Sequence, residues 1–300
     1  MRVVAPSGPV PAEPLQSGLA VLRDVLGLDV SLSRGVSGPA DGGAPEPAGP
    51  DRYLAAPDAW RAWSLVDAID DPSVDAIWCA RGGYGAGRLL PRVADALGRL
   101  GKPLVGFSDV TALHCAAACS GVVTFHGPVV TQLGRLDAES IDGARRLLSG
   151  EVGAGGLLLR VGPPLRGGIA AGRLAGGNLA LLASLCGTPW APDLTGAVVF
   201  LEDVGEPAYR VDRMVWQLRQ AAGLDRAAAL IVGDFNGVTD EEPAWTRAIW
   251  EELARELPCP VVLGAPVGHG ARNHALPVGA RVRLDAEGGT LTLLEQAVES

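Results

Sequence analysis

Residues 103–119 read PLVGFSDVTALHCAAAC. The apolar start of this stretch predicts a short buried strand, and the segment from Val110 to Cys119 predicts a helix. The residues between them form a strand–turn–helix junction, which is one βα step of a parallel α/β sheet. Ser108 lies at this junction, where a sharp turn can expose a serine hydroxyl to a ligand.

Two interpretations of Ser108 fit this spacing. Gly106 matches the first glycine of a G-x-S-x-G nucleophile elbow, but Val110 occupies the position of the second glycine, so the match is partial. In the alternative, the side chain of Ser108 only caps the helix that begins near Asp109. Spacing alone leaves both interpretations open.

Short apolar runs alternate with helix-period segments on both sides of this junction. In the first half of the chain, strands are expected at residues 3–5, 28–32, 74–79, 103–106 and 122–125. Segments with helical spacing separate these runs. The alternation predicts βαβ units around a mostly parallel sheet.

Glycine and proline mark the expected domain boundary. Residues 151–168 contain Gly153-Ala-Gly-Gly and Gly162-Pro-Pro. We expect this stretch to link an N-terminal domain, residues 1–150, to a C-terminal domain, residues 169–300.

The composition argues against several functional classes. The 300 residues are 48% hydrophobic despite 41 Gly and 23 Pro, so disorder is not expected, although Gly35–Pro50 is typical of a loop. Asp and Glu number 34 against 25 Lys and Arg, a net charge of −9 without a basic run, which disfavours nucleic-acid and anionic-membrane partners. Without a signal-peptide pattern or a membrane-length apolar run, we expect a cytoplasmic protein.

Disulfide and metal chemistry find little support in the sequence. Five scattered cysteines in apolar surroundings are expected to be buried reduced thiols: Cys79, Cys115, Cys119, Cys186 and Cys259. Cys115 and Cys119 could offer two thiolates on one helix face, but no second pair of ligands has suitable spacing. We therefore expect neither a metal nor another cofactor.

Polar residues that directly follow strands are the candidates for an active site, because ligands of parallel α/β sheets bind beyond the carboxyl ends of the strands. Glu202 follows the apolar run 197–201, where a carboxylate needs a partner. His269 lies in a glycine-flanked turn, which favours it as a general base over His114 in its apolar helix. With Ser108, these residues could form a nucleophile, an orienting acid and a base.

A glycine-rich turn follows the expected strand 74–79. Its residues Arg81-Gly-Gly-Tyr-Gly carry backbone N–H groups that could face a phosphate or a developing oxyanion. The spacing fits neither a P-loop nor a dinucleotide fingerprint, and an ordinary tight turn is the alternative. Arg81, with Tyr84 nearby, could hold a substrate carboxylate or pair with a carboxylate of its own domain.

Nine short strings occur in one order between about residues 3 and 285. They include Ala80-Arg-Gly-Gly-Tyr-Gly, Gly106-Phe-Ser-Asp-Val, Phe200-Leu-Glu-Asp-Val-Gly-Glu and Gly268-His-Gly-Ala-Arg-Asn-His. Together the strings resemble the LD-carboxypeptidase family, which also includes the microcin C immunity peptidases. The resemblance implies an α/β fold with a Rossmann-like, parallel-sheet N-terminal domain and a smaller, mixed α/β C-terminal domain. It also implies a metal-independent enzyme that forms a homodimer.

The resemblance assigns the catalytic roles to Ser108 as nucleophile, Glu202 as the acid and His269 as the base. The oxyanion donors that it implies are backbone N–H groups of Gly83 and Asp109. The typical reaction of the family removes the terminal D-alanine from a murein tetrapeptide, in cytoplasmic cell-wall recycling.

We expect Arg81, with Asn178 and beside Tyr84, to meet the terminal carboxylate of a muropeptide. One alternative within the family is an immunity hydrolase that cleaves a peptidyl-adenylate antibiotic, for which Trp190 could provide a stacking platform. Another is a non-catalytic muropeptide sensor, against which three competent triad side chains argue. The loop Gly35–Pro50 is richer in glycine and proline than the family pattern.

Overall fold

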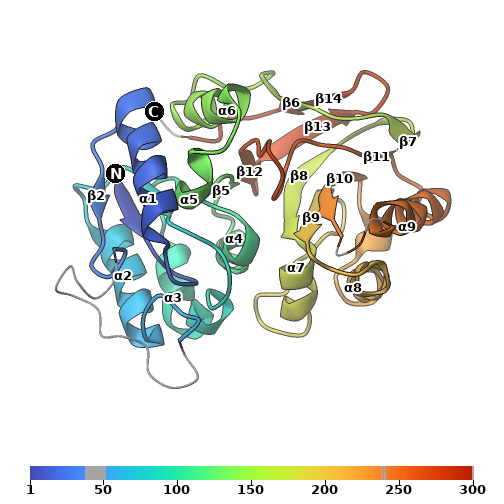
Figure 1. Cartoon of the computed structure of the whole chain (residues 1–300). Coiled ribbons are helices and arrows are strands. Elements are labelled where there is room, and N and C mark those ends of the chain that lie inside the picture. The colour runs from blue at the N-terminus through green and yellow to red at the C-terminus, as the bar shows by residue number, and fades with distance from the viewer. Residues whose placement is uncertain (38–51, 238, 240, 299–300) are drawn as a thin grey trace. The chain divides into compact units, whose positions relative to one another are not determined.

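The computed structural model describes residues 1–37, 52–237, 239 and 241–298, and the chain divides into two compact units, Met1–Asp137 and Ala138–Ser300 (Figure 1). Beyond position 37, the loop expected at Gly35–Pro50 lies outside the described residues.

The first unit is built on a parallel sheet with the strand order β5-β4-β3-β1-β2. Its strands are β1 (Arg2–Val4), β2 (Ser31–Leu32), β3 (Ile77–Cys79), β4 (Leu104–Gly106) and β5 (Thr124–His126). All residues of β3, β4 and β5 are buried, as expected for strands that are covered by helices on both faces, whereas the edge strand β2 is not buried. The predicted parallel sheet is confirmed.

Helices connect these strands and form two groups. Helices α2, α3 and α4 pack side by side, whereas α1 packs against α5. Leu15, Leu19 and Leu22 make the buried stripe of α1 and of the short π-helical turn that continues it. The bounds are α1 (Ala12–Ala20), the π turn (Val21–Val25), α2 (Asp58–Asp70), α3 (Leu90–Leu97), α4 (Thr111–Cys119) and α5 (Val130–Leu133).

The second unit contains a mixed sheet with the order β6-β14-β13-β8-β9-β10-β11-β7. Neighbours from β8 to β11 are parallel, and the pairs beyond them on both sides are antiparallel. The strands of this sheet are β6 (Leu157–Arg160), β7 (Pro164–Arg166), β8 (Ile169–Asn178), β9 (Val198–Val204), β10 (Ala229–Asn236), β11 (Val261–Val262), β13 (Arg281–Asp285) and β14 (Thr290–Leu293). The short strand β12 (Leu276–Val278) is part of the same unit but not of this sheet. The mixed α/β character matches the expectation, and β13 and β14 form a terminal antiparallel hairpin.

Helices α7, α8 and α9 lie side by side in the second unit (Figure 1). The apolar spacing of α8 buries Val211, Val215 and Leu218. The bounds are α6 (Ala138–Leu148), α7 (Leu179–Leu185), α8 (Ala208–Ala221) and α9 (Glu242–Glu256).

The expected domain boundary differs from the structure. Residues 138–150, assigned above to the N-terminal domain, form α6 and the turn after it in the second unit, which is thus the longer of the two. Residues 151–168, expected as a linker, contain β6 and β7, and both strands pair within the second sheet. The glycines and prolines here form the turns between short strands, and such turns have the same composition as a linker.

One strand was not predicted, and one expectation needs correction. The long strand β8 does not stand out in the sequence, because Gly and Ala have low strand propensity, yet it lies between β13 and β9 in the sheet. The five cysteines are thiols, but Cys119 is exposed at the end of α4 and Cys186 is only half-buried.

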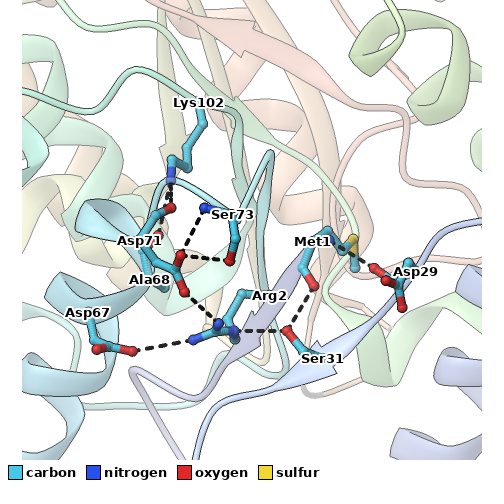
Figure 2. A network of polar contacts seen from close by, with 9 residues as sticks. All are labelled: Met1, Arg2, Asp29, Ser31, Asp67, Ala68, Asp71, Ser73 and Lys102. Atoms are coloured by element: carbon cyan, nitrogen blue, oxygen red, sulfur yellow. Dashed lines mark hydrogen bonds and ion pairs between the residues drawn. The ribbon is translucent and has the colours of Figure 1, made fainter.

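A polar network fixes one edge of the first unit (Figure 2). The Arg2 guanidinium donates to Ser31 Oγ at 2.8 Å and to Asp71 Oδ2 at 2.9 Å, which connects β1 to β2 and to the end of α2. Lys102, the one lysine of the chain, donates to the carbonyl oxygens of Ala68 and Asp71. A cation at these last carbonyls stabilises the C-terminus of α2.

None of the helices in the described ranges combines the length and the apolar character that crossing a membrane requires.

His114 connects α4 to two strands of the first sheet, and it is completely buried. Its Nε2 atom lies 2.8 Å from Gly106 O, and its Nδ1 atom lies 2.8 Å from Thr124 Oγ1. Because a carbonyl only accepts, Nε2 carries the proton and Nδ1 accepts from the threonine hydroxyl. Burial lowers the pKa of His114 to about 4, so the ring is neutral.

We expect acid to destabilise the protein partly through His114. Between pH 6.5 and about 4 the unfolded chain binds a proton at this residue and the folded chain does not, so stability falls as the pH falls through this window. The loss at this site reaches up to about 3 kcal/mol. His114→Gln keeps a donor and an acceptor but cannot titrate, so urea denaturation at pH 7 and 4.5 should show a smaller loss for the variant. Equal losses in both proteins would contradict the assignment.

Candidate active site

The backbone of Ser108 is strained. Ser108 follows β4 and begins a 3₁₀ turn, Ser108–Val110, that leads into α4. Its φ is +63°, and among the described residues no other non-glycine residue has a positive φ. This left-handed conformation costs an L-residue roughly 1–2 kcal/mol and persists only where the surroundings impose it.

The helix-cap interpretation of Ser108 is not supported by its geometry. The residues that precede the 3₁₀ turn and α4 are Phe107 and Val110, and neither makes a side-chain capping bond. The sharp reversal instead depends on Gly106, where an added Cβ would lie only 2.9 Å from Val110 Cγ1 and 3.0 Å from Cys79 Cβ. The junction is therefore built as an elbow, although valine replaces the second glycine of the motif.

The glycine-rich turn after β3 lies directly against Ser108. A Cβ at Gly82 would be 2.9 Å from Ser108 Cβ and 3.1 Å from its Oγ, so only glycine allows this approach. Gly83 and Gly85 have φ values of +104° and +122°. The turn is held from the other side by Gly8, whose N–H donates to Gly82 O at 3.1 Å.

Arg81 and Tyr84 also lie on this turn. Arg81 is half-buried, and its Nη1 donates to Pro9 O at 2.5 Å. Tyr84 is 53% exposed and makes an edge-to-face contact with Tyr53, with 5.5 Å between the ring centres. This contact is to a carbonyl, and among the described residues Arg81 forms no ion pair with a carboxylate.

In the second unit, Glu202 and His269 form a pair. Glu202 lies within β9, since the strand continues beyond the apolar run, and its side chain is fully buried. Its Oε2 is 2.7 Å from Nδ1 of His269, whose side chain is 17% exposed. The carboxylate accepts a hydrogen bond from the Nδ1–H group, and in this tautomer Nε2 is left as a proton acceptor. This is the tautomer that a general base requires.

The turn that carries His269 is fixed on both sides. The N–H of Gly268 donates to Asn273 Oδ1 at 3.1 Å, and the N–H of Gly270 donates to Asp234 Oδ2 at 3.0 Å. Gly268 has φ +129°, and a Cβ there would lie 3.0 Å from Glu202 Oε2. Burial and the charge of Glu202 raise the pKa of Asp234.

Asp203 and Asn178 support the same part of the second sheet. Burial raises the pKa of Asp203 to about 6, although its carboxylate accepts from the N–H groups of Ala180 and Val204 at 2.8 Å. Asn178 donates to Asp203 at 3.0 Å and caps α7 by accepting from Leu181 N–H at 3.2 Å. These contacts give Asn178 a structural task, which the sequence interpretation did not assign to it.

The structure thus groups the candidate residues within the two units. The first unit brings Ser108 and Asp109 next to the turn with Arg81, Gly83 and Tyr84, and the second unit pairs Glu202 with His269 near Asn178. Sequence analysis missed Arg61, Asp234 and Asn273. Within the described residues, no three His, Cys, Asp or Glu side chains are grouped as metal ligands.

Comparison with known families covers most of the chain. The profile of the LD-carboxypeptidase N-terminal domain matches residues 1–127, and that of the LD-carboxypeptidase C-terminal domain matches residues 171–284. Ser108 lies in the first region, and Glu202 and His269 lie in the second.

Individual relatives agree with the profiles. The chain is 34% identical over 300 residues to a murein tetrapeptide carboxypeptidase of Pseudomonas aeruginosa, with 95% of this chain and 92% of that protein covered. It is 24% identical over 271 residues to the microcin C7 self-immunity protein of Escherichia coli, covering 79% of this chain and 78% of that protein.

A solved structure extends the likeness to the fold. The crystal structure of muramoyltetrapeptide carboxypeptidase from Oxalobacter formigenes superposes with a TM-score of 0.83 at 31% identity, covering 100% of this chain and 99% of that one. With both domain profiles matched and with relatives above 30% identity over nearly the whole length, the chain belongs to the LD-carboxypeptidase family and is a carboxypeptidase.

Proposed function

We propose that this carboxypeptidase hydrolyses the amide bond before the terminal D-alanine of murein tetrapeptides, with Ser108 as nucleophile, His269 as base and Glu202 as its orienting acid. The observation that carries the proposal is the left-handed backbone of Ser108. Strain of this kind persists where function needs it, and a hydroxyl presented on a strand–helix turn is the geometry of a nucleophile.

The chemistry follows acyl transfer. Nε2 of His269 takes the proton of the Ser108 hydroxyl as its oxygen attacks the amide carbonyl carbon. The N–H groups of Gly83 and Asp109 stabilise the oxyanion that forms. His269 then gives its proton to the leaving amine of D-alanine, and an acyl-enzyme remains. Water, activated by the same histidine, releases the shortened peptide and restores the serine.

The contact between Glu202 and His269 supports the role of His269 as the base. The imidazolium that appears during attack is stabilised by the carboxylate of Glu202, which is buried and therefore acts through a weakly screened interaction. Because the pair is complete inside the second unit, the base is oriented before any substrate binds.

Substrate preference follows from the relatives and from Arg81. The proteins that match above 30% identity include enzymes named for murein tetrapeptides. Arg81 presents a guanidinium on the turn beside Ser108, which suits the free carboxylate of a terminal D-alanine. We place the enzyme in cytoplasmic recycling of cell-wall peptides, as a homodimer. Light scattering of the purified protein tests the dimer, and a monomer mass would refute it.

We expect Ser108→Ala to abolish release of D-alanine from a murein tetrapeptide. Removal of the nucleophile of a triad lowers kcat by about 10⁶-fold. Mass spectrometry of the products gives the readout, with and without a chelator. Parallel arms use the tetrapeptide with an amidated C-terminus, which Arg81 should not accept, and a peptidyl-adenylate.

The outcomes of this experiment separate the alternatives. Release that persists in Ser108→Ala, or that the chelator abolishes, contradicts the serine mechanism. Cleavage of the peptidyl-adenylate alone would identify an immunity hydrolase instead, and binding of the muropeptide without any cleavage would identify a sensor.

We expect Ser108→Gly to be more stable than Ser108→Ala by about 1 kcal/mol, because glycine adopts the left-handed conformation without strain. Both variants lack the hydroxyl, so the difference in free energy of unfolding isolates the backbone. Gly101→Ala, at a glycine without a positive φ and with open space around its Cβ position, serves as the control and should not show the penalty. Equal stability of the two Ser108 variants would show that the site is unstrained.

We expect Glu202→Gln to lower kcat by roughly 10²–10⁴-fold, because the neutral amide no longer stabilises the imidazolium or enforces the Nδ1-protonated tautomer. The matched control is Glu206→Gln, at a carboxylate that pairs with Arg210 near the start of α8 and should leave kcat unchanged. Steady-state kinetics from pH 5 to 9 provide the measurement. A kcat within threefold of the wild type would remove Glu202 from the mechanism.

A further inference from the structure

Two charged side chains are buried beside the nucleophile without being part of the triad. Arg61, on α2, is 2% exposed, and Asp109, the residue after Ser108, is 1% exposed. Burying a charge is costly unless hydrogen bonds and an opposite charge compensate it. Both residues therefore need an explanation in terms of what they bind.

Arg61 and Asp109 hold the two ends of one peptide group. Nη1 of Arg61 donates to Gly85 O at 3.0 Å, and Oδ2 of Asp109 accepts from Ala86 N–H at 2.8 Å. The carbonyl of residue 85 and the N–H of residue 86 belong to the same peptide plane. In a trans peptide these two groups point in opposite directions, so the two contacts together prevent the plane from rotating.

This peptide needs such a restraint because it ends a turn of glycines. Gly83 and Gly85 adopt positive φ, and glycine alone does not restrict the backbone to these angles. Upstream, the turn is anchored where Gly8 N–H donates to Gly82 O. The N–H of Gly83 shares its peptide plane with Gly82 O, so the bond from Gly8 restrains this N–H at one end of the turn, and the Gly85–Ala86 peptide restrains the turn at the other end.

Arg61 carries the restraint to the rest of the first unit. Its guanidinium donates to Ala56 O at 2.9 Å and to Pro6 O, and it forms an ion pair with Asp58 at 2.6 Å. The segment after β1 and the start of α2 are thus linked to the turn after β3. The buried guanidinium has a partner on each side, and burial lowers its pKa without neutralising it.

Asp109 adds a direct link between the turn and the nucleophile. Asp109 directly follows Ser108 in the chain, and its side chain accepts a hydrogen bond from the N–H of Ala86, in the segment after β3. Any displacement of the glycine turn relative to Ser108 must therefore break a charge-assisted hydrogen bond in a buried place.

We propose that Arg61 and Asp109 are positioning residues that fix the Gly85–Ala86 peptide and thereby aim the Gly83 N–H at the oxyanion formed on the substrate. The inference rests on the proposed function, in which Gly83 donates to the oxyanion. In this role the pair stabilises the transition state but not the bound substrate, because a misdirected N–H weakens oxyanion binding and leaves ground-state binding intact.

The first test is Asp109→Asn. The amide keeps the shape of the side chain but loses one acceptor oxygen and the charge opposite Arg61. We expect kcat for the tetrapeptide to fall about 10²-fold while KM stays within threefold, as on loss of one oxyanion donor. Affinity for a tetrapeptide boronic acid, which forms a tetrahedral adduct with the serine, should fall in parallel. Asp70→Asn, at a carboxylate paired with Arg99 on the surface, is the matched control.

A second variant tests the same role independently, in case Asp109→Asn does not fold. Arg61→Lys keeps the positive charge near Asp58 but lacks the fork that reaches several carbonyls at once, and it should produce the same split between kcat and KM. Titration of active serines with a fluorophosphonate counts competent sites, so that kcat is expressed per active site.

These measurements separate the positioning role from a merely structural one. The inference is overturned if either variant has fewer competent sites but an unchanged kcat per site, if KM rises as much as kcat falls, or if both variants are unfolded by circular dichroism. Normal kinetics of both variants, alongside an active wild type and an inactive Ser108→Ala, would refute the inference and leave the proposed function standing. An inactive wild type would count against the proposed function itself.

Discussion

The first unit is organised around one backbone angle, the φ of +63° at Ser108. An L-residue resists this conformation, so the surrounding structure must impose it. On one side, His114 donates a hydrogen bond to the carbonyl of Gly106, the last residue of β4. On the other side, the glycine turn lies so close to Ser108 that position 82 has no room for a side chain. The ends of β3 and β4 and the start of α4 therefore depend on each other through this angle.

The second unit is constrained by the burial of a carboxylate. Glu202 is fully buried in β9, and the contact with His269 provides its charge-assisted partner. The topology makes this possible, because the parallel strands β9, β10 and β11 end at the same edge of the sheet. A register shift in β10 lies at Asp234, which holds the turn of His269, and a bulge is a usual way to redirect a side chain at a strand end.

Features with a local signal in the sequence could be predicted from it. Local patterns predicted the βα alternation, which the structure confirms. Local chemistry made Ser108, Glu202 and His269 candidates, since each stands where a strand gives way to a turn or where a polar residue interrupts an apolar run, and their catalytic roles stay a prediction. The missed features lack a local signal. Strand β8 is made of small residues that pair only because β13 and β9 are present, and the turns between β6, β7 and β8 have the composition of a linker. Arg61 lies within an ordinary helix pattern, and only the fold shows that it reaches a carbonyl 24 residues away.

The distribution of the candidate residues over the two units has a physical consequence. Each half of the proposed chemistry is held by contacts within its own unit: the serine turn through Asp109 and Arg61, and the base through Glu202, Asn273 and Asp234. The residues that hold the two halves, such as Arg61 and Asn273, share no hydrogen-bond partner in these contacts, so we expect the effects of their substitution on stability to be additive. Their effects on turnover cannot be additive if the triad acts as a unit, because once the nucleophile is lost the base has no proton to remove. The proposed triad therefore predicts additive effects on stability for the residues that hold each half, together with strong coupling in kcat between the triad residues themselves.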